Sequence, residues 1–210
     1  MYDVAKMKRE YSDAVKVVRS RIEDEFVAAF EAIYRDSTVA HDLGRPTSLV
    51  ERTEILTTSD IDKVFREAGF YVILTDYPVE GNNCRLRMEG LRAVYRGECA
   101  TTRLRVLSHL ANPTYRAGFE ARSMRYTSAT RNAGKLFHEK VWPHCLKLDG
   151  SDGPSGINIE EPRYANFRWS VLVHRMNGSS QDIRRIAETA FDRAFGKPAA
   201  SRENEKKRKK

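Results

Sequence analysis

The sequence predicts an α+β protein with a small, mostly antiparallel sheet and helices packed on one side of it. Three observations lead to this fold class. Residues 70–76 and 167–174 combine β-branched and aromatic residues between turn-forming segments, as strands do. Residues 3–35 and 183–195 repeat apolar side chains every three or four positions, as amphipathic helices do. With 40% apolar and 31% charged residues, the 210-residue chain can build one globular core with extensions.

The first predicted element is a long amphipathic helix over residues 3–35. Its opposite face is charged, and a helix of this length packs across a whole domain or against a second chain. Residues 36–57 then predict an irregular connection. The apolar positions of the helix are Val4, Met7, Tyr11, Val15, Val18, Ile22, Phe26, Phe30 and Ile33.

A short helix and a strand are predicted after this connection. Ser59 and Asp62 suggest a capping box, and the apolar residues that follow share one helical face. Gly69 supplies a left-handed end for this helix. The strand over residues 70–76 then follows directly.

The next segments are predicted to extend the sheet. After a polar turn, residues 84–88 form the strand that returns beside 70–76, and residues 91–96 add another strand. Residues 101–112 leave two alternatives open, because alternation at their start favours a strand while their leucine spacing favours a helix. If they form a strand, four arginines share one outward side: Arg85, Arg87, Arg103 and Arg105.

Beyond this point the pattern predicts an ordered loop or short helical turns over residues 113–134 and a helix over 135–142. The last helix is capped by Ser179 or Ser180 and ends at Gly196. The basic segment after it has a composition typical of disorder. The predicted organisation therefore has three parts: a long helix over 1–35, a single α+β domain over 36–196, and a disordered basic tail over 197–210.

Two basic zones stand out against an acidic remainder. Residues 84–131 hold ten arginines, three glutamates and no lysine, which gives +7, and residues 197–210 add +5. Because the whole chain carries +8, the rest of it sums to −4. Clustered cations favour a polyanion, since they release counterions from phosphate, but ion pairs within the chain explain the same pattern.

The first functional hypothesis is a non-enzymatic protein that binds DNA or RNA without sequence specificity. Arginine's planar fork suits phosphate, and a basic tail contacts phosphate without reading bases. Nearby aromatic residues such as Tyr95 and Tyr115 can stack on bases. The predicted contact residues are Arg85, Arg87, Arg92, Arg96, Arg103, Arg105, Arg116, Arg122, Arg125, Lys206, Lys207, Arg208, Lys209 and Lys210.

The alternative hypothesis is a structural or assembly component, for example of a virus particle or phage. The arginines and the long helix would then contact partner subunits, which include further copies of the chain. A third hypothesis, a metal-dependent nuclease, rests on Asp76 and Glu80, which lie on one predicted hairpin. No phosphate-binding loop, dinucleotide-binding or hydrolase motif is present, so we predict no enzyme, no cofactor and no metal.

Localisation follows from cysteines and hydropathy. Cys84, Cys99 and Cys145 lack the paired spacing of a disulfide framework or zinc site, which favours free thiols in a reducing compartment: cytoplasm, nucleus or virus particle. The sequence has no apolar run of roughly 20 residues and no signal-like N-terminus, so neither a membrane nor a secreted location is predicted.

Overall fold

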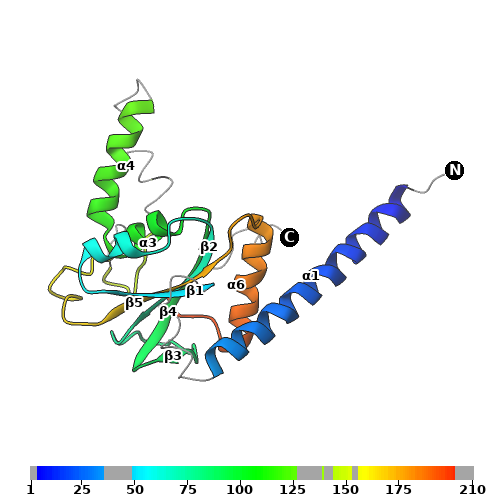
Figure 1. Cartoon of the computed structure of the whole chain (residues 1–210), viewed down its shortest axis with the longest axis horizontal. Coiled ribbons are helices and arrows are strands. Elements are labelled where there is room, and N and C mark those ends of the chain that lie inside the picture. The colour runs from blue at the N-terminus through cyan, green and yellow to red at the C-terminus, as the bar shows by residue number, and fades with distance from the viewer. Residues whose placement is uncertain (1–3, 36–48, 127–138, 140–143, 153–155, 202–210) are drawn as a thin grey trace.

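The computed structural model describes residues 4–35, 49–126, 139, 144–152 and 156–201, which form a sheet with helices around it (Figure 1). The sheet has five antiparallel strands in the order β1-β5-β2-β4-β3. The predicted α+β class is therefore confirmed. The strands are β1 (Val50–Ile55), β2 (Gly69–Thr75), β3 (Arg87–Met88), β4 (Leu91–Cys99) and β5 (Trp169–Arg175). The helices are α1 (Val4–Arg35), the 3-10 helix η1 (Thr58–Lys63), α3 (Thr102–Leu110), α4 (Asn112–Tyr126) and α6 (Gln181–Phe195).

Strand β2 is the centre of the fold, because it pairs with β5 on one side and with β4 on the other. All seven of its residues are buried. Tyr71 and Ile73 point to one face of the sheet, while Phe70, Val72 and Leu74 point to the other. A strand without a polar face needs cover on both sides.

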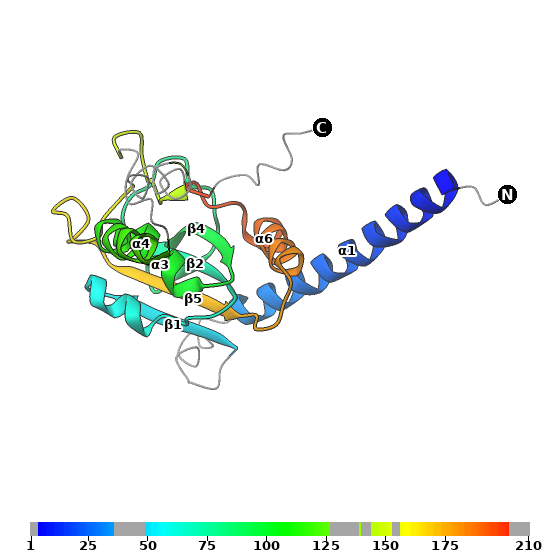
Figure 2. The ribbon, with the colours of Figure 1, turned by 90° about the horizontal axis from the view of Figure 1, so that it is seen from above.

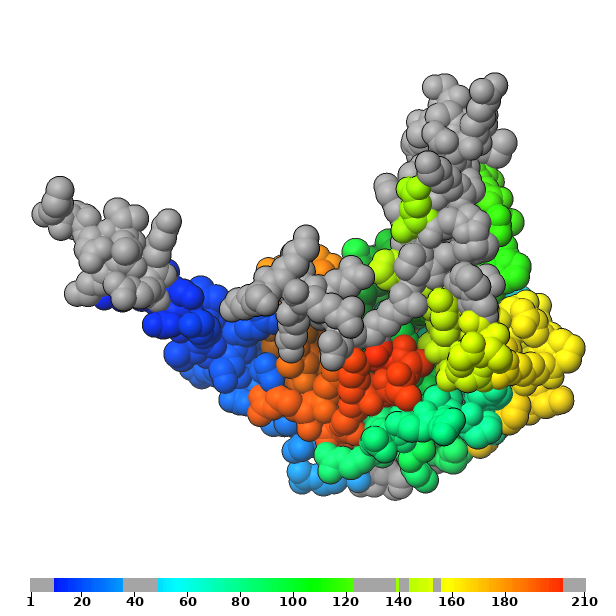
Figure 3. All heavy atoms as spheres, turned by 180° about the vertical axis from the view of Figure 1, so that it is seen from behind, coloured from blue at the N-terminus to red at the C-terminus, as the bar shows by residue number. Residues whose placement is uncertain are grey.

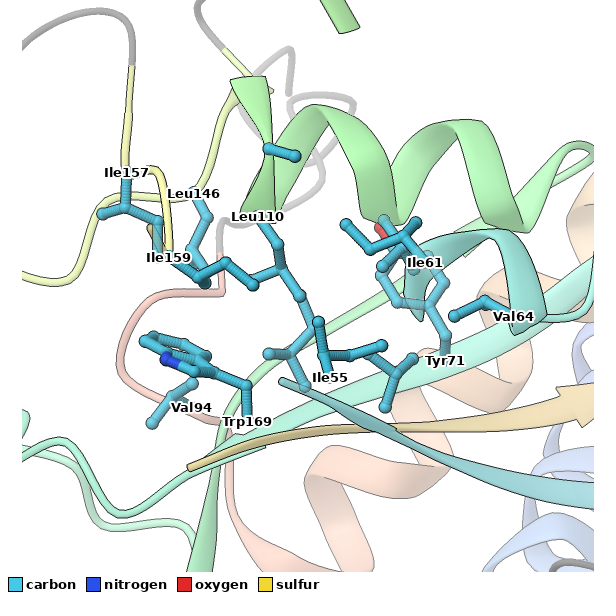
Figure 4. Close-up of a cluster of buried hydrophobic side chains, with 14 of the residues drawn as sticks. Ile55, Ile61, Val64, Tyr71, Val94, Leu110, Leu146, Ile157, Ile159 and Trp169 are labelled. Carbon is cyan, nitrogen blue, oxygen red and sulfur yellow. The ribbon is translucent and has the colours of Figure 1, made fainter. Parts of the chain in front are cut away.

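The first face of the sheet is covered by η1, α3 and the loop that precedes β5 (Figure 4). Ile61 of η1 and Leu110 of α3 pack with Tyr71 of β2. Ile157 and Trp169 extend the same cluster toward the beginning of β5.

The second face is covered by α1 and α6. Phe30 of α1 and Phe191 of α6 both pack on Phe70, with ring centroids 5.4 and 5.5 Å from it. The expectation that helices pack on one side only is therefore wrong. The reason is that the side chains of β2 from Phe70 to Leu74 are apolar on both faces of the sheet, so both faces must be shielded from water.

Helix α6 confirms the predicted last helix and its cap. Ser180 Oγ accepts a hydrogen bond from the backbone N–H of Ile183 at 3.3 Å. At the other end, Gly196 has a φ of 83°, a conformation that favours glycine, and its N–H donates to the carbonyl of Asp192 at 2.9 Å.

Helix α1 runs without interruption for 32 residues, about 48 Å at 1.5 Å per residue. Its second half packs on α6 and the sheet. Its first half projects from the rest of the described molecule (Figures 1 and 2), and every side chain from residue 10 to residue 21 is exposed. None of the helices in the described ranges combines the length and apolarity that crossing a membrane requires.

The strand that returns beside β2 is β4, not residues 84–88. The pairing runs from Gly69 opposite Cys99 to Thr75 opposite Arg92. Residues 84–86 instead cross the end of α6. Their alternation resembles that of a strand because Cys84, Leu86 and Met88 all enter the apolar cluster between the sheet and the helices α1 and α6.

Residues 102–126 form two helices in place of a strand and a loop. Val106 and Leu110 of α3 face the sheet, so the leucine spacing, not the short alternation, indicated the structure. Pro113 stands in the first turn of α4, where its missing N–H costs no helical hydrogen bond. The helix predicted over 135–142 falls, apart from residue 139, outside the described residues.

Two short elements also differ from expectation. Strand β1 lies inside the segment predicted to be irregular, and pairs along its whole length with β5. The predicted helix after it is the 3-10 helix η1, whose capping box uses Thr57 and Asp60 in place of Ser59 and Asp62. Hydrogen bonds from Lys63 and the Thr57 backbone hold the pKa of Asp60 well below its usual range.

Candidate nucleic-acid interface

The arginines of residues 84–131 do not form one continuous surface. Because α3 is a helix, Arg103 and Arg105 do not share a sheet face with Arg85 and Arg87. Most of the nine arginines predicted to contact nucleic acid instead contact the chain itself.

Arg96 is the most deeply engaged of them. Its Nε and one Nη donate to the two carboxylate oxygens of Asp192 at 3.0 and 2.7 Å, and its other Nη donates to Glu188 at 3.2 Å. The side chain is only 8% exposed. Burial alone would lower the pKa of Arg96, but the carboxylates of Asp192 and Glu188 raise it. Arg96 therefore joins β4 to α6 and cannot reach a phosphate.

Two further arginines hold carbonyl groups at helix ends. Arg85 Nη2 donates to the carbonyl of Ala194 at 2.6 Å, in the last turn of α6. Arg103 Nε donates to the carbonyl of Val64 at 2.8 Å, directly after η1. Such carbonyls have no partner inside their own helix, so these arginines complete helix ends.

Arg105, Arg116 and Arg122 also contact the chain. Arg105 donates to the carbonyl of His144 at 3.0 Å, and Arg116 pairs with Glu120 at 3.0 Å. The Arg122 guanidinium stacks 5.8 Å from the ring centre of Tyr115. Arg125 is part of α4, without a described side chain, and Lys206–Lys210 lie outside the described residues.

Arg87 and Arg92 are different. They lie directly opposite each other on β3 and β4, and within the described part of the chain their guanidinium groups have neither an ion pair nor a hydrogen bond. Arg87 is exposed, and the Nε of Arg92 is buried without a hydrogen-bond partner. Like charges in facing strand positions are unfavourable. An anion that approaches this pair would relieve that repulsion.

The last described residues are fixed beside the same strand. The N–H of Ala200 donates to the carbonyl of Val94 at 3.1 Å, and the N–H of Arg96 donates to Ser201 Oγ at 2.9 Å. Ser201 is 6% exposed. The fold thus continues to residue 201, not 196 as predicted, and the basic segment after it begins at β4.

This arrangement brings the two basic zones together. Val94 is two residues from Arg92, which is about 7 Å along a strand. We call Arg87, Arg92 and the anchored residues 199–201 the β4-edge surface. Sequence patterns could not reveal it, because hydrogen bonds between residues more than 100 positions apart create it.

The predicted aromatic platform is not available in the described residues. The Tyr95 ring packs 4.4 Å from the ring centre of His109, inside the first core. Tyr115 and Phe119 pack beside the buried thiol of Cys145. These rings support the fold, so base stacking has no evident site among them.

Asp76 and Glu80, the residues of the nuclease hypothesis, are not brought together as a metal site. Asp76 accepts hydrogen bonds from the backbone N–H and the Nε of Arg168 at 2.8 and 3.0 Å. In the described ranges no three His, Cys, Asp or Glu residues are grouped as metal ligands. The nuclease hypothesis therefore has no geometric support in this part of the chain.

A small depression lies between α4 and the loop before β5. Its volume is about 140 Å³, smaller than the roughly 300–1,000 Å³ of ordinary ligand pockets. It is lined by Asn112, Pro113, Arg116, Gly156, Ile157, Asn158 and Glu161.

The three thiols are all free. Cys84 and Cys145 are buried and Cys99 is partly exposed. Burial raises the pKa of the Cys84 thiol, so it stays protonated and unreactive.

The first half of α1 is a second surface without cover. Tyr11, Val15 and Val18 are 57–68% exposed although they belong to the predicted apolar face. The periodicity predicted this face correctly, but it could not tell that nothing in the described molecule covers it.

A comparison of the chain with protein-family models, curated proteins and solved structures found no match.

Proposed function

We propose that this is a non-enzymatic protein that binds the phosphate backbone of DNA or RNA through the β4-edge surface and the tail after Ser201. The observation that carries the proposal is the anchoring of Ser201 on β4. It starts the basic tail on β4 at Arg96, four residues along the strand from Arg92. Within the described chain, Arg87 and Arg92 are the two arginines of the zone without an ion pair, a hydrogen bond or an aromatic contact.

The chemistry suits sequence-independent binding. Residues 202–210 hold six Lys or Arg residues, which contact phosphate as point charges or forks and read no base edge. Because the tail is tethered at β4, a phosphate held by either part raises the local concentration of phosphate for the other. The free thiols fit a reducing compartment, such as cytoplasm, nucleus or a virus particle.

The test is fluorescence-anisotropy binding of the full chain to duplex DNA and to RNA across a salt series. We expect log affinity to fall linearly with log salt, by about 0.9 per phosphate contacted on DNA. Truncation after Ser201 removes the six cations of residues 202–210 and reduces the slope most. Arg87→Gln with Arg92→Gln reduces it by about 2.

The matched control is Arg66→Gln, which removes an exposed arginine outside the β4-edge surface and should leave the slope unchanged. Binding that is absent at low salt, or insensitive to salt, would rule the proposal out.

The second candidate function is a structural assembly component. The exposed apolar row of α1 favours it, because soluble chains rarely leave such a row uncovered. The solution mass of the full chain distinguishes this candidate from a protein that works as a monomer.

A further inference from the structure

The first half of α1 carries two patterns that fit each other. One is a row of apolar side chains on a single face of the helix, and the other is a reversal of charge along its length. Together they identify what can cover the helix.

The apolar row runs from Val4 to Phe26. At 100° per residue its members occupy an arc of roughly 100°, and Val15 stands at the middle of the row. Val17 points elsewhere, about 130° from the centre of the row, although it is equally exposed. The row is approximately symmetrical about its middle, so a second helix running the opposite way presents apolar residues at matching heights. Its members are Val4, Met7, Tyr11, Val15, Val18, Ile22 and Phe26.

The charges reverse about the same point. Lys6, Lys8 and Arg9 make the beginning of α1 basic, whereas residues 23–25 are Glu, Asp and Glu. Lys6 and Glu25 are equally far from a centre between residues 15 and 16, as are Lys8 and Glu23 and also Glu10 and Arg21. An antiparallel pair therefore places opposite charges together at both ends, while a parallel pair places like charges together.

Two of the three acidic residues remain accessible to a partner, while Glu23 pairs with Arg193 at 2.9 Å and is only 17% exposed. Asp24 and Glu25 contact Arg193 and Arg21 of their own chain, yet their side chains stay 59% and 69% exposed. Ala28 and Ala29 are exposed as well, so the side of α1 away from the sheet is open beyond Phe26. The first half of α1 stands clear of the described body (Figures 2 and 3), whereas Phe26 at the end of the row already packs in part against the cluster under α6.

We propose that two copies of this chain pair through the first halves of their α1 helices, antiparallel, with a two-fold axis near Val15. The contact is isologous: each copy gives the same apolar row and both charge blocks. This deepens the second candidate function by naming its partner and geometry, and it is independent of nucleic-acid binding.

Sedimentation equilibrium of the full chain tests the pairing. The wild type should have twice the mass of one chain, and Val15→Asp should raise the dimer dissociation constant about a hundredfold. Each buried valine contributes roughly tenfold, and the dimer carries the change twice. Val17→Asp, with the same chemistry on another side of α1, should leave the constant unchanged. Because both positions are exposed in the single chain, neither variant should alter thermal unfolding measured at concentrations where the wild type is dissociated.

Charge reversal tests the orientation. Lys6→Glu and Glu25→Lys should each weaken the dimer, and the double variant should restore it. A spin label at Ala5→Cys, in a Cys99→Ser background, should lie about 30 Å from its counterpart along the helices, because 20 residues separate the two positions. In a parallel pair the labels would lie side by side.

If the wild type is a monomer at all accessible concentrations, both the pairing and self-assembly as a function are overturned. Binding of the helix to anionic vesicles would not rescue either of them. A dimer that Val15→Asp leaves intact, or whose labels lie side by side, would overturn this interface alone and leave assembly through another surface.

Discussion

At the scale of the residue, Arg92 and Arg96 show how one residue type serves two purposes on one strand. They lie four positions apart on β4. Arg96 is enclosed by Glu188 and Asp192 of α6, while Arg92 lies between Thr75 of β2 and Arg87 of β3, with no carboxylate bonded to it in the described chain. The bulge of β4 opposite Ile73 and Leu74 shifts the alternation, so the two side chains leave the sheet on opposite faces.

Arg96→Met should therefore be costly. It leaves two carboxylates beside the core without their cation, and we expect a loss of about 3–5 kcal/mol in the free energy of unfolding. Arg92→Met, the matched control on the same strand, should change stability by no more than about 0.5 kcal/mol. Urea unfolding of both variants measures the difference, and equal effects would contradict these roles.

At the scale of the element, α1 is held to the sheet by an aromatic cluster around a neutral histidine. His174 of β5 lies 2.6 Å from the Tyr34 hydroxyl and packs against the rings of Phe30 and Phe70. Burial lowers the pKa of His174 to about 3 and raises that of Tyr34. Docking of the second half of α1 therefore favours the uncharged form of His174.

Acidification should therefore weaken the fold. Below its ordinary pKa of 6.5 the unfolded chain binds a proton at His174, whereas the folded chain does not until about pH 3. Stability thus falls as pH decreases between these values. Urea unfolding from pH 7 to pH 5 should show this slope, and His174→Gln should flatten it. An unchanged slope in that variant would contradict the assignment.

Elements with a local signature were predictable, and the others were not. Strand β5 and helices α1 and α6 show their own periodicity, and α6 also has its own caps, so their sequences suffice. Strand β1 has the polar sequence VERTEI, and its burial comes from pairing with β5, from Val50 opposite His174 to Ile55 opposite Trp169. A pairing over more than 100 residues leaves no trace in a local pattern.

The candidate site was less predictable than the fold, for the same reason. The density of arginine was visible, but the partners that engage Arg85, Arg96 and Arg105 come from α6 and from the loop at His144. Only the tertiary structure separates these arginines from Arg87 and Arg92.

At the scale of the whole molecule, residues 197–201 belong to the folded body although their sequence resembles a linker. They are joined to it by hydrogen bonds with Asn82, Val94 and Arg96. Truncation after Gly196 should therefore cost roughly 3 kcal/mol, about 1 kcal/mol for each of three hydrogen bonds. Truncation after Ser201 should leave the midpoint of thermal unfolding unchanged. Identical midpoints for the two truncated chains would contradict this role.

The strand order affects how the chain folds while it is being synthesised on the ribosome. Strand β5 lies between β1 and β2, yet it is made about 100 residues after them. Until residue 175 has left the ribosome, β1 has no neighbouring strand to pair with, and one edge of the mostly apolar β2 stays unpaired. The incomplete chain therefore exposes unpaired strand edges until β5 is made. We expect this to slow folding, and we expect the chain to be most prone to aggregation during this interval.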